Sequence, residues 1–515
     1  MDIDARLAAA WARLPDYLSS HVLVSVTALA IGLGISLPLA VLSMRRPVLR
    51  GILLAVASVI QTIPSIALLA LFYPLLLAIA ALSERLFGLD FSALGFLPSV
   101  LALALYSMLP VIRNTVTGLA GIDRSLRDAA RIMGMTPGQS MRAVELPLAA
   151  PVIMAGIRTS AVWVIGTATL STPIGQTSLG NYIFAGLQTQ NWVFVIFGCV
   201  AAAILALAVD QLLALMEQGV AGHSRGRIAA GAAGLALVVL AALLPAHVSA
   251  RNSYVVGTKN FTEQYVLGAL MQQRLEAAGL ASTRRDGLGS AVIFKALTAG
   301  DVDVYVDYTG TIWADYMHRG DVKPREVVLK DVTDWLKKTY GVRLLGDLGF
   351  ENAYALAMPR KEADRLGINS IADLAQHAPQ LTIGSDLEFF DRPEWKAIQK
   401  AYGLHFREQR SMQPAFMYQA AANGDVDVVS AFSSDGQIAK YDLMVLRDPK
   451  NAIPPYDAVL LLAPKDAHDR KLIAALKPLI GAIDVKDMRA ANLRASQGTL
   501  PAAVAKSLWR KIESK

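Results

Sequence analysis

Long apolar runs in the first half of the chain constrain its fold more than any other feature. A helix needs about 20 apolar residues to cross the hydrocarbon core of a bilayer, and runs of that size recur at 21–43, 51–80, 93–112, 151–173, 191–214 and 228–247. The second run is too long for one crossing and is interrupted by QTIPS at 61–65. We expect a Pro-kinked helix there, followed by a partly buried or re-entrant segment. The apolar runs predict that the first half of the chain is an all-α polytopic membrane domain with about six transmembrane helices.

The basic residues indicate how these helices are oriented. Residues 1–250 contain 14 Arg and no Lys, the first Lys of the chain being Lys259. Most of these Arg residues lie in three loops, which follow the first run, separate the third and fourth, and precede the sixth. Cytoplasmic loops carry the positive excess, so we expect these loops in the cytoplasm and everything after Val248 on the extracytoplasmic side of a bacterial inner membrane. The net charge of +7 is spread over both halves, which argues against a nucleic-acid partner.

The longest Arg-rich loop has a distinctive spacing. We expect a short helix that ends at Gly134, a turn, and a second short helix that meets the next span at Leu146-Pro147. The spacing resembles the EAA coupling loop of ABC importer permeases, with Asp128 in place of the usual Glu. The resemblance implies that this loop, 128–147, docks on a separate ATPase subunit. Its motif positions are Asp128, Ala129, Ala130, Gly134, Leu146 and Pro147.

The second half changes character at Ser253, where short β-branched runs begin to alternate with helical stretches and predict an α/β domain. The pentapeptide Gly-Asp-Val-Asp-Val occurs twice, at Gly300 and at Gly424. We expect each Gly to end an alanine-rich helix in a left-handed conformation before a strand begins. Ligands collect at the carboxyl ends of strands in open α/β sheets. Two lobes whose loops face a shared cleft are therefore expected.

Six phrases in this half occur in a specific order: VGTKNFTEQ, VDYTGT, ENAYALAM, EFFDRPE, YGL and SAFSSDGQI. They resemble the periplasmic binding proteins of betaine and choline importers, over nearly all of 253–515. Together with the coupling loop, they make the chain similar to fused permease and binding proteins of quaternary ammonium osmoprotectant uptake. The resemblance implies an inner-membrane importer subunit that captures glycine betaine, choline or a similar solute and passes it through its permease domain.

The expected domains follow from these boundaries. They are an amphipathic segment at 1–20, the permease at 21–217, the last transmembrane helix and tether at 218–251, and the two-lobed binding domain at 252–515. Lobe 1 is expected at about 252–357 and 456–515, and lobe 2 at about 358–455. The resemblance further implies a permease homodimer in the membrane lipid, two copies of an ABC ATPase, and a small solute as partners.

The expected site follows from the chemistry of the solute. A trimethylammonium group has no hydrogen to donate, so aromatic faces hold it by cation–π attraction worth about 0.5–2 kcal/mol per contact. A betaine carboxylate needs donors, and Arg392 offers a planar fork. Two features depart from the family: Phe432 stands where Tyr is expected, and Arg392 is followed by Pro-Glu-Trp instead of x-Asp-Gly. The substrate-binding residues that the resemblance implies are Tyr308, Tyr354, Phe432, Arg392, Lys259, Thr311, Phe390 and Trp313.

Catalytic signatures are missing from the sequence. It contains no Gly-x-x-x-x-Gly-Lys-Ser/Thr loop, no nucleophile elbow and only one cysteine, Cys199. We expect a transporter subunit without catalytic residues, metal or cofactor of its own, with ATP and magnesium held by the partner ATPase. Carnitine and ergothioneine remain alternative solutes. A ligand-gated channel or sensor with a similar two-lobed domain is the alternative of another class, although there the spans interrupt the binding module, whereas here all precede it.

Overall fold

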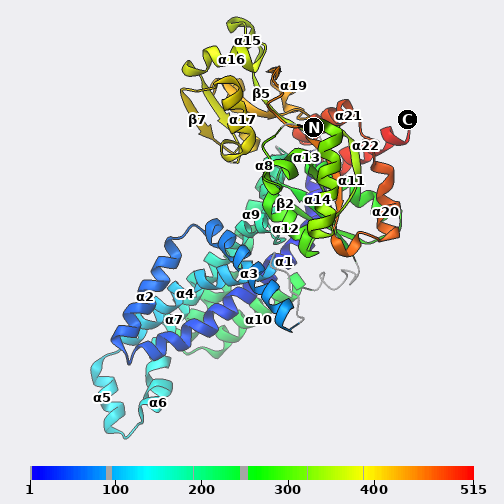
Figure 1. The fold of residues 1–515 in the computed structure, drawn as a ribbon. Coiled ribbons are helices and arrows are strands. Elements are labelled where there is room, and N and C mark those ends of the chain that lie inside the picture. Colours follow the sequence, from blue (N-terminus) through cyan, green and yellow to red (C-terminus); the bar gives the residue numbers. More distant parts are fainter. Residues whose placement is uncertain are drawn as a thin grey trace. The chain divides into compact units, whose positions relative to one another are not determined.

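The computed structural model describes residues 3–87, 95–189, 191–243, 253–321, 323–386 and 388–514 (Figure 1). The chain forms two compact units. One comprises Met1–Phe184 and Val193–Ser249, and the other comprises Ala185–Trp192 and Ala250–Lys515. The first unit is helical and the second is an α/β domain with two sheets, which confirms the predicted fold class.

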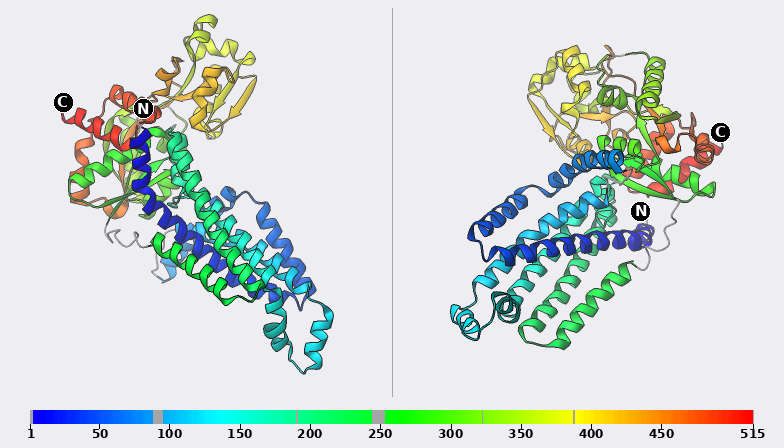
Figure 2. Two further views of the ribbon diagram at one scale, coloured as in Figure 1. Left: turned by 180° about the vertical axis from the view of Figure 1, so that it is seen from behind. Right: turned by 60° about the horizontal axis from the view of Figure 1, so that its bottom comes forward.

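The helical unit is built around three long helices that lie side by side, α1, α4 and α7 (Figures 1 and 2). The expected segment at 1–20 is not separate, because α1 runs without a break from Ile3 to Ser43. The helices of this half are α1 (Ile3–Ser43), α2 (Pro47–Thr62), α3 (Ser65–Phe87), α4 (Phe96–Ala120), α5 (Arg124–Ile132), α6 (Pro137–Ser140), α7 (Leu146–Ala168), α8 (Gly180–Gln188), α9 (Trp192–Ala221) and α10 (Arg225–Leu243).

The second apolar run differs from a single span. Within the described ranges, five helical segments are long and apolar enough to cross a membrane: Ile3–Ser43, Phe96–Ala120, Pro137–Ile174, Trp192–Ala221 and Arg225–Leu243. The predicted second span is instead divided into α2 and α3 at Pro64. Ile63 is extended, with φ −72° and ψ 128°, because a residue before Pro is disfavoured in the helical region. Together the five segments and the broken pair account for about six spans, and the break at Pro64 takes the place of the expected kink.

Small residues allow the three central helices to approach closely. A Cβ added at Gly32 of α1 would lie 1.7 Å from Ser107 Oγ of α4, and one added at Gly156 of α7 would lie 2.6 Å from Asn114 Cβ. Such contacts are typical of membrane helices, where packing rather than hydrophobic exclusion holds helices together. A charged pair adds to them: Arg158 Nε of α7 lies 2.5 Å from Asp210 Oδ1 of α9.

The Arg-rich loop forms a helical elbow, which we define as residues 124–145, between the ends of α4 and α7 (Figure 1). Asp123 caps α5 by accepting a hydrogen bond from Ser125 N, and Thr136 and Gln139 form a capping box at α6. Gly134 has φ +78°, as its place in the turn requires. A short π-helix, Met141–Glu145, leads into α7 at Leu146-Pro147. The predicted sequence of short helix, glycine turn and second helix is present.

Lobe 1 of the α/β domain contains a five-stranded sheet with the order β2-β1-β3-β10-β4. Strand β1 is parallel to β2 and β3, and β10 is antiparallel to β3 and β4. Its elements are β1 (Tyr254–Lys259), α11 (Thr262–Ala277), β2 (Ser282–Leu288), α12 (Ser290–Ala299), β3 (Val304–Tyr308), α13 (Thr309–Thr311), α14 (Arg325–Tyr340), β4 (Arg343–Glu351), β10 (Asp457–Leu462), α20 (Arg470–Leu476), α21 (Val485–Ser496) and α22 (Pro501–Glu513).

Lobe 2 repeats this plan with the order β7-β6-β8-β5-β9. Strand β6 is parallel to β7 and β8, and β5 is antiparallel to β8 and β9. Figure 2 shows this lobe in yellow and orange. Its elements are β5 (Tyr354–Pro359), α15 (Arg360–Leu366), α16 (Ile371–His377), β6 (Thr382–Ser385), α17 (Pro393–Tyr402), β7 (Glu408–Ser411), α18 (Pro414–Asn423), β8 (Val428–Phe432), α19 (Gln437–Lys440) and β9 (Leu443–Val445).

The chain passes from lobe 1 to lobe 2 between β4 and β5, at residues 352 and 353. This crossing comes earlier than the sequence-based boundary near 357. Strand β5 pairs with β8 from Tyr354 to Ala357, so these residues belong to the second sheet. The return crossing lies between β9 and β10, close to the predicted position at 456.

The Gly-Asp-Val-Asp-Val repeat has the same structure in both lobes. Gly300 ends α12 with φ +79°, and Gly424 ends α18 with φ +82°. The second Asp of each copy then accepts a hydrogen bond from the first residues of the neighbouring strand: Asp303 Oδ2 from Val255 N at 2.5 Å, and Asp427 Oδ2 from Thr382 N at 2.7 Å. The repeat therefore fixes the central strand of each sheet against its parallel neighbour.

Candidate functional site

A cleft of about 120 Å³ lies where the two lobes of the α/β domain meet. Both sheets contribute to it, through residues at the ends of β1 and β3 in lobe 1 and of β5 and β8 in lobe 2. Drug-sized ligands occupy pockets of about 300–1,000 Å³, so this cleft fits a much smaller solute. Its aromatic lining residues are Phe261, Tyr308, Tyr354, Phe432 and Tyr456, and its charged ones are Lys259, Asp386, Glu388 and Arg392.

The aromatic side chains form a continuous row across the cleft. The ring of Phe261 lies 6.1 Å from that of Tyr308 and 5.9 Å from that of Phe432, measured between centroids. Tyr354 continues the row, 5.0 Å from Phe432 and 5.8 Å from Tyr456. These separations are those of favourable aromatic pairs. Rings from both lobes thus present π faces to one small volume, as binding of a quaternary ammonium group requires.

The hydroxyl of Tyr308 is held by a buried carboxylate. It donates to Glu263 Oε1 at 2.6 Å and accepts from Gln264 Nε2 at 3.0 Å. Burial and the neighbouring Glu263 raise the pKa of Tyr308 well above its usual value, so the phenol stays protonated and acts as a donor. These two hydrogen bonds therefore fix the ring in place before any ligand arrives.

Glu263 also joins the two lobes. In addition to Tyr308, it accepts hydrogen bonds from Asn352 at 3.0 Å, Ser434 at 2.5 Å and Asn492 at 2.7 Å. Ser434 follows β8 in lobe 2, whereas Glu263 and Asn492 lie on α11 and α21 of lobe 1. Burial raises the pKa of Glu263, and these four donors oppose that rise. The carboxylate is the centre of a polar network at the junction of the lobes.

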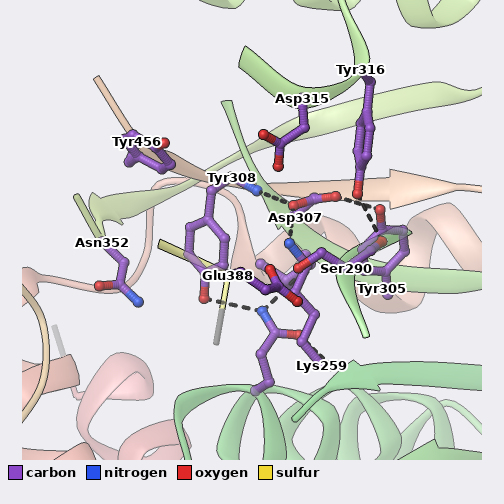
Figure 3. Close-up of polar contacts among 12 residues, drawn as sticks. Lys259, Ser290, Tyr305, Asp307, Tyr308, Asp315, Tyr316, Asn352, Glu388 and Tyr456 are labelled. Atoms are coloured by element: carbon purple, nitrogen blue, oxygen red, sulfur yellow. Dashed lines mark hydrogen bonds and ion pairs between the residues drawn. The ribbon is translucent and has the colours of Figure 1, made fainter. Parts of the chain in front are cut away.

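The two cations of the cleft are paired with carboxylates of the chain itself. Lys259 Nζ lies 2.5 Å from Asp307 Oδ1, and neither side chain is more than 2% exposed (Figure 3). Arg392 contacts Glu394 through Nε at 3.2 Å and Nη2 at 3.0 Å, and Asp315 through Nη1 at 2.8 Å. Both cations also approach aromatic rings, Lys259 that of Tyr308 at 5.3 Å and Arg392 that of Tyr354 at 5.0 Å.

Two carboxyl groups near the cations, Asp315 and Asp386, have raised pKa values. Burial raises the pKa of Asp315 to about 6, although the neighbouring Arg392 opposes that rise. Burial also raises the pKa of Asp386, against two hydrogen bonds that its carboxylate accepts from the backbone N–H groups of Glu388 and Phe389. The polar end of the cleft is thus rich in acidic groups.

Six of the eight residues expected to bind substrate line the cleft. They are Tyr308, Tyr354, Phe432, Arg392, Lys259 and Thr311. Trp313 does not: it is fully buried in lobe 1, where its Nε1 donates to Asp321 O and Arg319 lies 3.7 Å from its ring. Phe390 packs in lobe 2 against Phe389 and Trp395, at centroid distances of 5.9 and 5.6 Å. Both aromatic side chains serve packing, the commonest use of such residues.

Sequence reasoning missed four residues of this region, namely Phe261, Asn352, Tyr456 and Glu263. The first two lie inside phrases that carry the resemblance, VGTKNFTEQ and ENAYALAM, so their positions were already marked. Tyr456 precedes β10 and lies far along the chain from the others, without a local signal. Glu263 lies in VGTKNFTEQ as well, at a position that suits a residue of a helix terminus. It does lie in the first turn of α11, whose N-cap is Phe261, but its carboxylate serves the interlobe network.

The helical elbow is a second candidate site. Ile132 is 86% exposed and Met133 69% exposed, beside the exposed Leu126. Asp128 forms long ion pairs of 3.9 Å with Arg124 and Arg131, and Ala130 is buried. Exposed apolar side chains that cluster on capped helices are typical of a surface that contacts another protein. Within the described ranges, no group of three or more His, Cys, Asp or Glu side chains could hold a metal ion.

Comparisons with known proteins match both halves of the chain. The family model for the substrate-binding domain of ABC-type glycine betaine transport systems matches residues 252–511. The model for the inner membrane component of binding-protein-dependent transport systems matches residues 30–222.

Individual relatives cover the same two regions. The ergothioneine transport permease/ergothioneine binding protein of Helicobacter pylori (strain G27) is 30% identical over 80% of this chain and 74% of its own length. A choline transport system permease protein of Bacillus subtilis (strain 168) is 41% identical over 38% of this chain and 84% of its own. The crystal structure of a glycine betaine/carnitine/choline ABC transporter covers 51% of this chain and 99% of its own, with 27% identity and a TM-score of 0.45.

The Helicobacter pylori relative is named as a permease and a binding protein together, and the two family models match the two halves of this chain in that order. The matched families and the named relatives are transport proteins, so this chain is likewise a transporter subunit of the inner membrane and not an enzyme. The chain belongs to the family of ABC importer proteins that fuse a permease to a glycine betaine-type substrate-binding domain.

Proposed function

We propose that this importer captures a quaternary ammonium solute in the cleft between the lobes and releases it into its own permease domain. The observation that carries the proposal is the row of aromatic rings Tyr308, Phe261, Phe432 and Tyr354, which brings π faces from both lobes to one small cavity. A trimethylammonium group offers no hydrogen-bond donor, and aromatic faces are the protein surface that attracts it most strongly.

The solute is proposed at the level of its class. Relatives are named for choline, glycine betaine, carnitine and ergothioneine, all of which carry a quaternary ammonium group. Calorimetric titration of the full-length chain in lipid nanodiscs against these four solutes tests the proposal. At least one should bind, and Tyr354→Ala should weaken that binding by about tenfold or more, equal to about 1.4 kcal/mol. No binding of any of the four would refute it.

We further propose that two copies of the chain pair through their membrane halves and engage two copies of the ATPase, which hold ATP and magnesium. The elbow supports this, because its exposed Ile132 and Met133 provide an apolar contact beside the coupling-loop positions Asp128, Ala129, Ala130 and Gly134. Ile132→Asp should lower solute-stimulated ATP hydrolysis by the reconstituted complex without changing solute binding. Equal stimulation in the variant would contradict the assignment of the elbow.

The binding domain is proposed to lie outside the cytoplasm. The Arg-rich loops support this topology, since positive loops remain on the cytoplasmic side. The sequence provides a direct test, because every Lys follows residue 250. A membrane-impermeant amine reagent applied to spheroplasts should label lysine peptides of 259–515. Labelling of those peptides only after the cells are lysed would reverse the proposed topology.

A further inference from the structure

Every nitrogen of the Arg392 guanidinium is already engaged by a carboxylate of the chain. Nε and Nη2 form a fork on the two oxygens of Glu394, at 3.2 and 3.0 Å, and Nη1 contacts Asp315 Oδ2 at 2.8 Å. Arg392 is 6% exposed, Glu394 1% and Asp315 24%. Tyr456 donates its hydroxyl to Glu394 Oε1 and so holds the fork in place. The two remaining N–H groups, one each on Nη1 and Nη2, lie near Glu388 at 3.9 Å and the Tyr456 hydroxyl at 3.5 Å. A carboxylate of a ligand would therefore approach a guanidinium whose charge two carboxylates of the chain already balance.

Lys259, the other cation of the cleft, is also paired with a carboxylate of the chain. Lys259 is paired with Asp307, which also accepts hydrogen bonds from Tyr305 at 2.5 Å and from the backbone N–H of Tyr308 at 2.7 Å (Figure 3). Two more carboxylates, Asp386 and Glu388, line the cleft directly. The acidic groups around the two cations thus outnumber them, so the region carries a net negative charge when these groups are ionised.

We propose that Glu394 and Asp315 make the cleft selective against carboxylates, so that it prefers a quaternary ammonium alcohol with a single positive charge to zwitterionic betaines. This inference rests on the proposed function, because it concerns which quaternary ammonium solute the same cleft accepts. A zwitterion brings a carboxylate that competes with Glu394 for the fork, and displacement would leave a buried carboxylate without its partner. A solute with a single positive charge and no carboxylate is attracted by the acidic groups, and its binding leaves the pair of Arg392 and Glu394 intact.

Glu388 is suited to receive the hydroxyl of such an alcohol. Its side chain is 53% exposed, lines the cleft and lies 3.9 Å from Arg392 Nη1, too far for a hydrogen bond. A carboxylate has about four acceptor sites, so Glu388 can accept a ligand O–H while it remains near Arg392. The site then matches both ends of the ligand, with aromatic faces for the ammonium group and an acidic acceptor for the hydroxyl.

Titration of the full-length chain in nanodiscs with choline and with glycine betaine tests the inference. The wild-type chain should bind choline about tenfold more tightly or better, a difference of about 1.4 kcal/mol. Equal affinity, or tighter binding of glycine betaine, carnitine or ergothioneine than of choline, would overturn the inference while leaving the proposed function intact. If neither choline nor any betaine binds, the proposed function itself fails.

Variants of Glu394 and Asp315 test whether these two carboxylates cause the preference for choline. Glu394→Gln and Asp315→Asn should each strengthen glycine betaine binding relative to choline, lowering the ratio of the two affinities about tenfold for Glu394→Gln. The ratio of the two affinities is insensitive to a general loss of stability. If the variant at the more buried Glu394 folds poorly, Asp315→Asn provides the same test. Glu362→Gln, which removes the same charge at an exposed pair with Arg365 on α15, should leave the ratio unchanged. An unchanged ratio in both fork variants would overturn the proposal.

Discussion

The two lobes of the binding domain have the same scaffold but bring different side chains to the cleft. Their strand orders are equivalent, and a Gly-Asp-Val-Asp-Val turn precedes the central strand in each. At the end of that strand lobe 1 has Tyr308, whose hydroxyl donates a hydrogen bond to Glu263, whereas lobe 2 has Phe432, which has no hydroxyl. The comparison shows that the repeat determines where an aromatic ring lies, and that the residue at the strand end determines what the ring can do.

The largest difference between the lobes should appear when the two rings are removed. Tyr308 is 4% exposed, so Tyr308→Ala should destabilise the domain by about 3 kcal/mol through the cavity it leaves. It should also weaken solute binding by at least about tenfold. Phe432→Ala should lower stability less, because this ring is only partly buried. Thermal unfolding and calorimetry of both variants measure these effects.

Tyr308→Phe is the control for that pair, since it keeps the ring and makes lobe 1 resemble lobe 2. Loss of the hydroxyl leaves Glu263 with one donor fewer, which should cost about 1–2 kcal/mol of stability. Solute affinity should fall much less than in Tyr308→Ala. If Tyr308→Phe weakened binding as strongly as Tyr308→Ala, the phenol hydroxyl and not the π face would be the important group.

A second contrast concerns Asp435, a buried acidic residue that follows the central strand of lobe 2. Burial raises the pKa of Asp435 in lobe 2 to about 6, with hydrogen bonds from Gln437 N and Tyr418 opposing the rise. The folded state therefore binds the proton more tightly than the unfolded state, whose pKa is near 3.8. Ionisation of Asp435 thus destabilises the folded state fully above about pH 6, and this effect disappears as the pH falls toward 4.

Asp435→Asn should remove this dependence. The stability of the wild type relative to the variant should increase by about 2 kcal/mol between pH 7.5 and pH 4.5. Unfolding midpoints at several pH values, followed by tryptophan fluorescence, give the comparison. A constant difference between the two proteins across this range would mean that Asp435 has an ordinary pKa.

The turns themselves should behave alike in the two lobes. Asp303→Ala and Asp427→Ala each remove a carboxylate that accepts a hydrogen bond from the neighbouring strand, at 2.5 and 2.7 Å. Each should destabilise its lobe by about 1.5 kcal/mol. Asp303 also pairs with Lys465, but that side chain is 55% exposed and the pair should add little. Hydrogen exchange of the two sheets would resolve the lobes, and protection lost in only one lobe would break the equivalence.

The smallest effect is expected where lobe 2 is made to resemble lobe 1. Phe432→Tyr keeps the stacked ring, which lies at 7° to Phe261, and adds one hydroxyl at the cleft. Solute affinity should change by about threefold or less, equal to about 0.7 kcal/mol. A larger change would identify the missing hydroxyl as a determinant of specificity. The same titration that is used for the alanine variants provides the measurement.

Much of this architecture follows from local sequence signals. The Gly-Asp-Val-Asp-Val turns, the coupling-loop elbow with Gly134 and the division into a helical and an α/β half could be predicted because each depends on residues near one another in the chain. The break at Pro64 was only partly foreseen, since a proline in an apolar run is compatible with a kink as well as with two helices.

The site was less predictable, because its contacts join distant segments. The sequence indicates Arg392 as a donor, but the structure shows its fork closed by Glu394, two residues along the chain, and by Asp315, which comes from lobe 1 and has no local signal. Trp313 and Phe390 lie in the loops that the sequence indicates, but their rings pack against other residues of the domain and do not line the cleft. Position along the chain identifies a loop, whereas the direction of a side chain depends on packing from elsewhere in the fold.

The most direct test of the account is to compare choline with 3,3-dimethyl-1-butanol, an uncharged molecule of nearly the same shape, as ligands of the full-length chain in nanodiscs. Cation–π attraction depends on the charge of the ligand and not on its shape. If the aromatic cleft recognises a quaternary ammonium group, choline should bind at least about tenfold more tightly, about 1.4 kcal/mol, than the neutral molecule. Equal affinity for the two ligands, or no affinity for choline and for the betaines, would contradict the account.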